Sequence, residues 1–183
     1  MQLDQNAKSA RFIALVQPYL ADAYTLARWL TRNRDAADEV LQEACIRALA
    51  AIEQQTGANA RAWLLAIIRN TAYTWLSAKK RLRLVGLDDL SERDLARVEE
   101  GGAQDAPIVD PEAELIARAN AKQLERLISG LPMEFREALV LRDIQGLGYH
   151  EIAEVTGVPV GTVMSRLSRA RRRVIYSLKE ADA

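Results

Sequence analysis

Residues 147–173 read LGYHEIAEVTGVPVGTVMSRLSRARRR and carry the most specific pattern in the chain. A short amphipathic stretch precedes Gly157, and a glycine there allows a tight turn. Two residues later, Pro159 can occupy the first position of a second helix, where its missing N–H is harmless. This spacing predicts a helix-turn-helix over residues 149–169, a motif whose second helix enters the DNA major groove.

The second helix of this motif is expected to present a DNA-binding face. The run from Thr162 to Lys179 has six cationic side chains and no acidic one. Arginine can hold O6 and N7 of guanine with two hydrogen bonds, and hydroxyl groups suit phosphates or base edges. The candidates for DNA contact are Thr162, Met164, Ser165, Arg166, Ser168 and Arg169, with Arg171, Arg172 and Arg173 gripping phosphates. The alternative interpretation is a plain helical hairpin with a solvated basic end.

The composition of the whole chain excludes several other classes of protein. The chain has 183 residues, 49% of them apolar and 27% charged, which is ample for a packed core. No apolar run approaches the roughly 20 residues that span a bilayer, and the first ten residues lack a secretory pattern. Cys45 is the only cysteine, so there is no intramolecular disulfide, and His150 is the only histidine, which argues against a zinc site. We expect a cytoplasmic protein without a metal, another cofactor or membrane insertion.

Upstream of the motif, apolar residues recur at three- and four-residue steps, which predicts helices rather than strands. One helix is expected over Phe12–Leu30. A second should begin with Asp35 as its N-cap and continue to Ile52, and a third should include Trp63–Leu76. Their apolar stripes would pack them into a small bundle. We expect its core to include Trp63, Ile67, Ile68 and Trp75.

Between the two helical parts of the chain the periodicity is lost. Residues 85–109 are acidic and contain a Gly-Gly pair and Pro107, which is typical of a linker. The chain is therefore predicted to be all-α, with two small helical domains at 10–82 and 112–180 joined by a flexible acidic linker at 83–111. The net charge of zero hides basic stretches on both sides of this linker, which favours two contacts with a polyanion.

The whole chain resembles a sigma factor of bacterial RNA polymerase, of the compact extracytoplasmic-function (ECF) type. Residues 131–173 resemble region 4 of that family, which binds the −35 promoter element. DAADEVLQEACIRAL, residues 35–49, resembles the part of region 2 that docks on the polymerase clamp. RAWLLAIIRN, residues 61–70, followed by residues 71–81, resembles the part that melts and reads the −10 element. The resemblance implies core RNA polymerase, promoter DNA and an anti-sigma protein as partners, and no small-molecule substrate.

The resemblance also assigns residues of region 2 to the −10 element. Asn70 ends the 61–70 motif, and the asparagine of the family at this place helps to hold a base flipped from the −10 strand. The −10 candidates are Arg61, Asn70, Tyr73, Thr74, Lys79, Lys80 and Arg81. The chain departs from the family at Ala60, where an aromatic residue usually precedes the arginine. The preferred −10 sequence therefore does not follow from these residues.

A second group of region 2 residues is expected to bind core polymerase. They lie off the apolar stripe of the helix that begins at Asp35. An exposed aliphatic side chain flanked by acids and an amide is typical of a protein interface rather than of a DNA surface. The candidates are Asp38, Glu39, Gln42, Glu43 and Ile46. The alternative is a solvated acidic face.

Two other functions are alternatives to a sigma factor. An ordinary helix-turn-helix regulator with a helical sensing or dimerisation domain would bind duplex operators without polymerase. An enzyme would need a catalytic group, and HEIAE, residues 150–154, begins like the zinc-protease motif. Glu154 stands where that motif requires its second histidine, so a metal would have too few donors. We therefore expect no catalytic residue and no enzyme.

Overall fold

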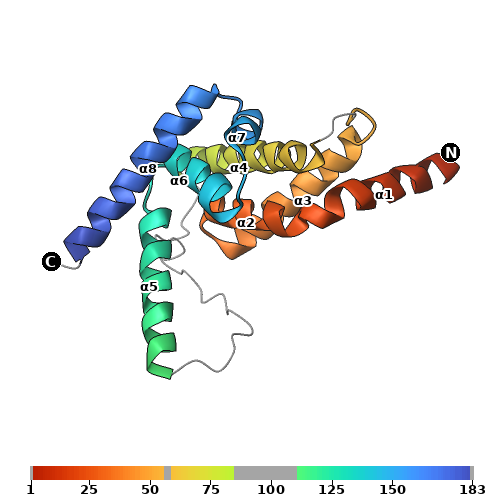
Figure 1. The fold of residues 1–183 in the computed structure, drawn as a ribbon. Coiled ribbons are helices and arrows are strands. Elements are labelled where there is room, and N and C mark those ends of the chain that lie inside the picture. Colours follow the sequence, from red (N-terminus) through yellow and green to blue (C-terminus); the bar gives the residue numbers. More distant parts are fainter. Residues whose placement is uncertain (1, 56–58, 85–110, 182–183) are drawn as a thin grey trace.

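The computed structural model describes residues 2–55, 59–84 and 111–181, and all regular structure in these ranges is helical (Figure 1). The absence of strands from the described ranges agrees with the all-α prediction. Residues 56–58 and 85–110 lie outside them, so the predicted flexible linker falls largely outside the described part of the chain.

The N-terminal unit contains one helix more than the sequence pattern predicted. Its elements are α1 (Gln2–Val16), the 3-10 turn η1 (Gln17–Tyr19), α2 (Leu20–Thr31), α3 (Arg34–Ala51) and α4 (Ala60–Leu84). The single helix predicted over Phe12–Leu30 is wrong, because Pro18 lies in the 3-10 turn and lacks the N–H that a continuous helix would use. Helix α1 also begins well before residue 10, where the domain was expected to start.

The start of α3 differs from the predicted cap by two residues. Asn33, not Asp35, is the N-cap: its backbone is extended, and its side-chain Oδ1 accepts a hydrogen bond from Ala36 N at 2.8 Å. Arg32 has a φ of 60° and ends α2 just before it. Asp35 instead lies in the first turn, where its negative charge favours the positive end of the helix dipole.

The core of the N-terminal unit lies where α2, α3 and α4 meet. Leu26 and Leu30 of α2, Val40 of α3 and Leu64 of α4 are almost completely excluded from solvent. Of the four side chains predicted for this core, Ile68 is fully buried, and Trp63, Ile67 and Trp75 are partly buried and pack against it. These contacts hold α4 in place against α2 and α3.

The C-terminal unit contains the predicted helix-turn-helix. Its elements are α5 (Pro111–Ser129), α6 (Met133–Leu139), the π-helical turn η3 (Val140–Ile144), α7 (Tyr149–Thr156) and α8 (Val160–Ala181). Gly157 follows α7 with a φ of 68°, a left-handed conformation that suits the tight turn predicted there. Helix α8 begins at Val160, so Pro159 precedes the helix, and its carbonyl accepts hydrogen bonds from the N–H groups of Thr162 and Val163.

Gly157→Ala is expected to lower the free energy of unfolding by about 1–2 kcal/mol, because a Cβ is strained in the left-handed conformation. Urea unfolding followed by far-UV circular dichroism measures the change. The matched control is Gly161→Ala, four residues away on α8, where nothing lies within 4 Å of an added Cβ and φ is not positive. Alanine there should leave stability unchanged or raise it by up to about 1 kcal/mol. Equal losses in both variants would contradict the role given to the turn.

The two units pack against each other and do not lie apart as separate lobes. Helix α7 contacts α4, and α6 contacts α2 (Figure 1).

Arg136 of α6 is only 5% exposed, and its guanidinium donates to Ser129 O at 2.6 Å and to Leu30 O at 3.4 Å. These carbonyls lie at the C-terminal ends of α5 and α2, where the helix dipoles are negative. Burial, and secondarily the charge of Arg32, lowers the pKa of Arg136 to about 10. The two domains predicted from sequence therefore share an interface that sequence did not predict.

Candidate nucleic-acid interface

Helix α8 presents a basic face to solvent from its N-terminal half onward. Val163, Leu167 and Ala170 are buried against the rest of the C-terminal unit. The opposite face is exposed, including Met164 at 53%. Of the nine predicted DNA contacts on α8, the exposed ones are Met164, Ser165, Ser168, Arg169, Arg171, Arg172 and Arg173. Thr162 and Arg166 are half-buried, so they present less of their surface than the pattern predicted.

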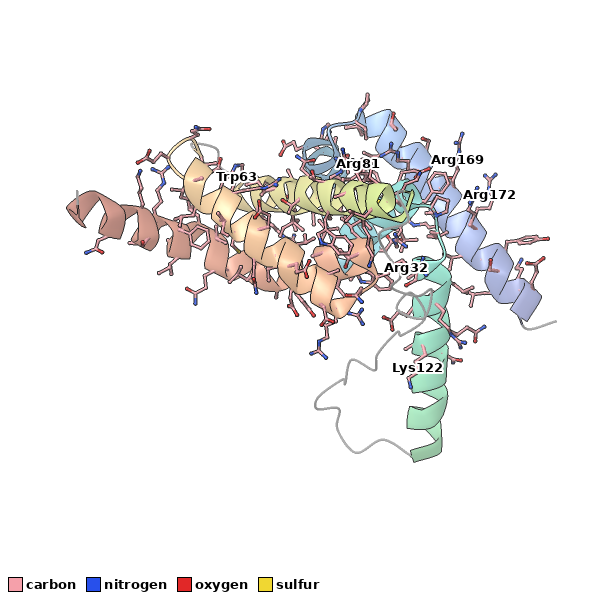
Figure 2. The ribbon with its side chains drawn as sticks, turned by 180° about the vertical axis from the view of Figure 1, so that it is seen from behind. Arg32, Trp63, Arg81, Lys122, Arg169 and Arg172 are labelled. Carbon is pink, nitrogen blue, oxygen red and sulfur yellow. The ribbon has the colours of Figure 1, made fainter. Side chains whose placement is uncertain are left out.

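The arginines of α8 differ in how they are engaged. Arg171 forms a two-pronged ion pair with Asp143, with Nε–Oδ2 at 3.0 Å and Nη2–Oδ1 at 2.5 Å, and this contact raises its pKa. The guanidinium of Arg173 lies over the ring of Phe135, 5.0 Å from its centroid. Arg169 and Arg172 make no hydrogen bond or ion pair with the described residues, and both project from α8 (Figure 2). Those two cations are the most available for a nucleic acid.

Helix α4 carries the residues predicted for the −10 element along its length. The exposed ones are Asn70, Thr74, Lys80 and Arg81, and the half-buried ones are Arg61, Tyr73 and Lys79. Lys79 Nζ lies 5.1 Å from the ring centroid of Trp75. The hydroxyl of Thr74 donates to Asn70 O at 2.9 Å, within the helix itself. The structure thus places these seven residues on one helix, spread over several turns.

Arg69 belongs with this group, although it is not among the −10 residues predicted from the sequence. Its Nη1 donates to Asn70 Oδ1 at 3.2 Å and its guanidinium lies 4.4 Å from the ring centroid of Tyr73. The Asn70 amide oxygen is therefore already oriented by its neighbour. The available signal was the position of Arg69 inside the acid-free basic run on either side of Asn70.

A buried carboxylate of the C-terminal unit contacts this part of α4. Glu137 of α6 is 0% exposed, and its Oε1 accepts from Arg69 Nε at 2.6 Å. The hydroxyl of Tyr73 donates to Glu137 Oε2 at 3.4 Å. Burial raises the pKa of Glu137, while the charges of Arg69 and Arg166 oppose that rise. Burial and then the negative charge of Glu137 raise the pKa of Tyr73 to about 12, so its hydroxyl stays protonated at neutral pH and can donate.

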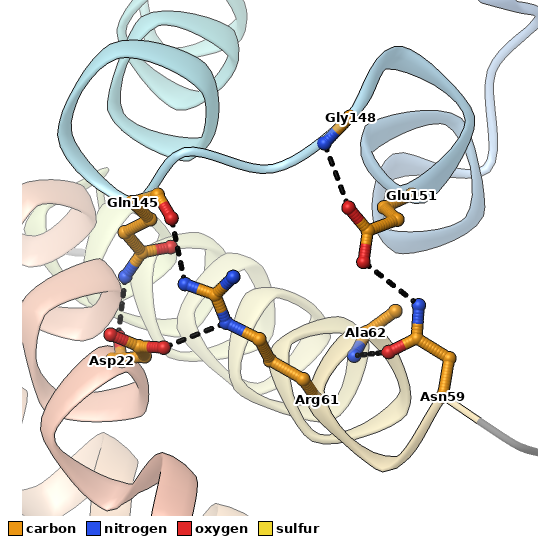
Figure 3. A network of polar contacts seen from close by, with 7 residues as sticks. All are labelled: Asp22, Asn59, Arg61, Ala62, Gln145, Gly148 and Glu151. Atoms are coloured by element: carbon orange, nitrogen blue, oxygen red, sulfur yellow. Dashed lines mark hydrogen bonds and ion pairs between the residues drawn. The ribbon is translucent and has the colours of Figure 1, made fainter.

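A second set of polar contacts joins the units at the beginning of α4 (Figure 3). Arg61 Nε pairs with Asp22 Oδ2 at 2.7 Å, and its Nη2 donates to Gln145 O at 2.7 Å. Gln145 Nε2 in turn donates to Asp22 O at 2.6 Å. Asn59 Nδ2 donates to Glu151 Oε1 at 3.1 Å. Arg61, a predicted −10 residue, and the nearby Asn59 are thus both held by the C-terminal unit.

The residues predicted to bind polymerase lie on the outer face of α3, and all five are exposed. Ile46 is 65% exposed, unusually high for a large aliphatic side chain. Glu39 Oε2 accepts from Trp75 Nε1 at 2.9 Å, and Glu43 Oε1 accepts from Arg47 Nε at 2.8 Å. Each of these two carboxylates thus accepts a hydrogen bond within the chain, whereas most of the Ile46 side chain is open to solvent.

The described part of the chain offers neither a metal site nor a membrane span. His150 is exposed on α7. Within the described ranges, no three His, Cys, Asp or Glu side chains gather in a group that could hold a metal ion. Among the described helices, none has the length and apolar character that crossing a membrane requires.

Comparison with known proteins identifies the family. The sequence profile "Sigma-70 region 2" matches residues 15–82, and "Sigma-70, region 4" matches residues 121–174. The ECF RNA polymerase sigma-E factor of Haemophilus influenzae is 38% identical over 179 residues, which are 94% of this chain and 89% of that protein. The chain belongs to the ECF sigma factors. The resemblance stated from sequence is confirmed, and the N- and C-terminal units are region 2 and region 4 of this ECF sigma factor.

Other relatives agree with this assignment. The ECF RNA polymerase sigma-E factor of Escherichia coli K12 is 34% identical over 171 residues, 93% of this ECF sigma factor and 87% of that protein. ECF RNA polymerase sigma factor SigE of Mycolicibacterium smegmatis is 33% identical over 163 residues, but this chain spans only 58% of its length.

A solved structure matches both regions in one superposition. The sigma factor RpoE of Bartonella quintana, in complex with the anti-sigma factor NepR, has a TM-score of 0.71 and 27% identity over 90% of this chain and 94% of that chain. CnrH in complex with the cytosolic domain of CnrY has a TM-score of 0.58 at 24% identity, which supports the fold. The match to RpoE thus extends over most of this ECF sigma factor, including both regions.

Proposed function

We propose that this chain binds core RNA polymerase and directs it to promoters, with no bond-making chemistry of its own. Region 4 would read the −35 duplex through α8, and region 2 would capture the −10 strand along α4. The observation that carries this proposal is the pairing of an exposed basic face on α8 with a second row of cations on α4 in one ECF sigma factor. Since polymerase and the chromosome are cytoplasmic in bacteria, we place the protein there too.

The polymerase contact would be made by the outer face of α3. Ile46 offers an uncovered apolar surface, and Asp38, Glu39, Gln42 and Glu43 surround it with acidic and amide groups. Such a composition favours a protein partner over a nucleic acid, because carboxylates repel phosphates.

We also propose an anti-sigma protein as the regulating partner. The support is the similarity to RpoE, whose structure was solved in complex with NepR. In the closed arrangement, Arg61, Arg69 and Tyr73 are engaged by region 4 and are not free for DNA. An anti-sigma protein that prefers this arrangement would keep the factor silent.

In vitro transcription tests the proposed function. Core polymerase with this protein is expected to start transcription at promoters that core polymerase alone does not use. The competing possibility, an ordinary helix-turn-helix regulator, predicts tight sequence-specific binding of duplex DNA by the pure protein and no new start sites. That combined result would contradict the proposal.

Asp38→Arg is expected to weaken binding to core polymerase by about five- to tenfold, because it reverses a charge on the proposed docking face. Fluorescence anisotropy of the labelled protein, titrated with core polymerase, measures the affinity. Glu180→Arg makes the same charge change on the exposed end of α8 and serves as the matched control. An equal loss in both variants would mean that total charge, and not the α3 face, governs the association.

A further inference from the structure

Three neighbouring side chains on α4 contact one another without any contribution from region 4. The guanidinium of Arg69 lies 4.4 Å from the ring centroid of Tyr73, and its Nη1 donates to Asn70 Oδ1 at 3.2 Å. Residues four apart on a helix lie on the same face, so stacking on Tyr73 keeps the guanidinium beside Asn70. Because all three residues belong to α4, these contacts do not depend on where region 4 lies.

The contact with Arg69 fixes which way the side-chain amide of Asn70 is turned. A guanidinium has five N–H donors and no acceptor, so the amide atom that it meets must be the oxygen and not the nitrogen. The Nδ2 group of Asn70 makes no hydrogen bond with the described residues. Since Asn70 is exposed, both N–H groups of this nitrogen are left for a ligand.

Asn70 and Arg69 therefore present mainly donors to an incoming base. Arg69 uses Nε and Nη1 in its hydrogen bonds with the described residues, and Nη2 in none, so further N–H groups lie beside the Asn70 amide. An asparagine amide that is free to turn can pair its oxygen and its nitrogen with N6 and N7 of adenine. Here the oxygen is already occupied, and the acceptor that the adenine amine needs is missing.

We propose that Arg69 is a positioning residue that makes Asn70 select cytosine or guanine at one position of the −10 strand. These two bases have two adjacent acceptors, N3 and O2 in cytosine and O6 and N7 in guanine. Adenine has its N6 amine beside both N1 and N7, and thymine has N3–H between O2 and O4, so either base opposes a donor with a donor. The inference rests on the proposed function, because it assumes that α4 captures the −10 strand.

Binding of single-stranded DNA to the holoenzyme tests this selection. The probes are fluorescein-labelled non-template strands that span the −10 element of a promoter found by in vitro transcription, with each position replaced in turn by the other bases. Fluorescence anisotropy measures the affinities. At one position, cytosine or guanine should bind about five- to twentyfold more tightly than adenine. Asn70→Ala should abolish that preference, which identifies the base that Asn70 reads.

Arg69→Met removes the guanidinium and keeps a long side chain on the helix. At the position read by Asn70, the preference over adenine should fall to about twofold or less, because the freed amide can then offer its oxygen to N6. In a chain that already carries Asn70→Ala, Arg69→Met should cause no further change in base preference. A positioning residue acts only through the residue that it positions, so the two effects are not additive.

Two other variants separate this role from the loss of a charge and from the loss of a contact with region 4. Arg81→Met removes an exposed cation further along α4, and it should weaken binding equally for all bases. Glu137→Gln removes the carboxylate that pairs with Arg69 in the free chain, and it should leave the base preference unchanged. Circular dichroism checks that each variant is folded.

The role of Arg69 is overturned if Arg69→Met keeps the preference, or if it weakens binding to every strand equally, as expected for Arg81→Met. The unaltered chain gives a test that needs no Arg69 variant, because a preference for adenine or thymine at the position read by Asn70 also contradicts the role. So does an Asn70→Ala chain whose preferences are unchanged at every position. Any of these results in a holoenzyme that initiates at promoters leaves the proposed function standing, whereas a chain that gives no new start sites refutes both.

Discussion

Replacing Ile68 by alanine is expected to lower the free energy of unfolding of region 2 by about 2–5 kcal/mol. Ile68 is 0% exposed and lies on the face of α4 that packs against α2 and α3. The change removes buried methyl and methylene groups and leaves a cavity, because neighbouring helices relax only partly. A loss of this size is a large part of the roughly 5–15 kcal/mol that stabilises a typical protein. Urea unfolding of the full chain, followed by circular dichroism, measures it.

Leu82→Ala on the same helix is the matched control. Leu82 is 50% exposed near the end of α4, so its truncation should change stability by no more than about 0.5 kcal/mol. Because α4 also carries the −10 candidates, the Ile68 variant should lose single-strand binding at the temperature at which region 2 unfolds. Similar stability losses in the two variants would contradict the core that we describe.

Most helices of this protein were predictable from sequence, because each helix has to bury a stripe of apolar side chains along one face. The rhythm of apolar residues on α4 and α8 is strong, and those helices were predicted in the correct places. The errors occur where a single residue determines a boundary. The apolar periodicity continues across Pro18, although the helix itself ends there. Asn33 and Asp35 are both residue types that commonly cap helices, so periodicity did not distinguish between them.

Exposure of the candidate residues was also largely predictable, since a residue off the apolar stripe of a helix faces outward. All five α3 candidates and seven of the nine on α8 are exposed. The contacts between regions 2 and 4 were not predictable, because periodicity describes each helix and not how two bundles meet. One signal was present: Arg136 and Glu137 lie between Phe135 and Ala138 on the short helix α6, whose apolar side chains have to be buried. Buried charges need partners, and here the partners lie in region 2.

Arg169→Ala is expected to weaken recognition of the −35 element by about 1–3 kcal/mol, roughly 5- to 150-fold in affinity. Arg169 is exposed on α8 and makes no ion pair with the described residues, so nothing within them competes with DNA for its guanidinium. If it donates to O6 and N7 of one guanine, the variant should also lose discrimination at that base pair. Holoenzyme binding to duplex promoters, each with one −35 base pair changed, measures both effects.

Arg171→Ala is the matched control, because it removes an arginine from the same helix two residues away. It distinguishes the loss of a base contact from the loss of one positive charge. Its guanidinium is already held by Asp143, so the variant should lose little affinity, and equally for every promoter sequence. Arg169→Ala should differ by showing a loss that depends on one base pair. If both variants weaken binding to the same extent on all sequences, Arg169 contacts phosphate alone, and base recognition must come from the other exposed side chains of α8, Met164, Ser165 and Ser168.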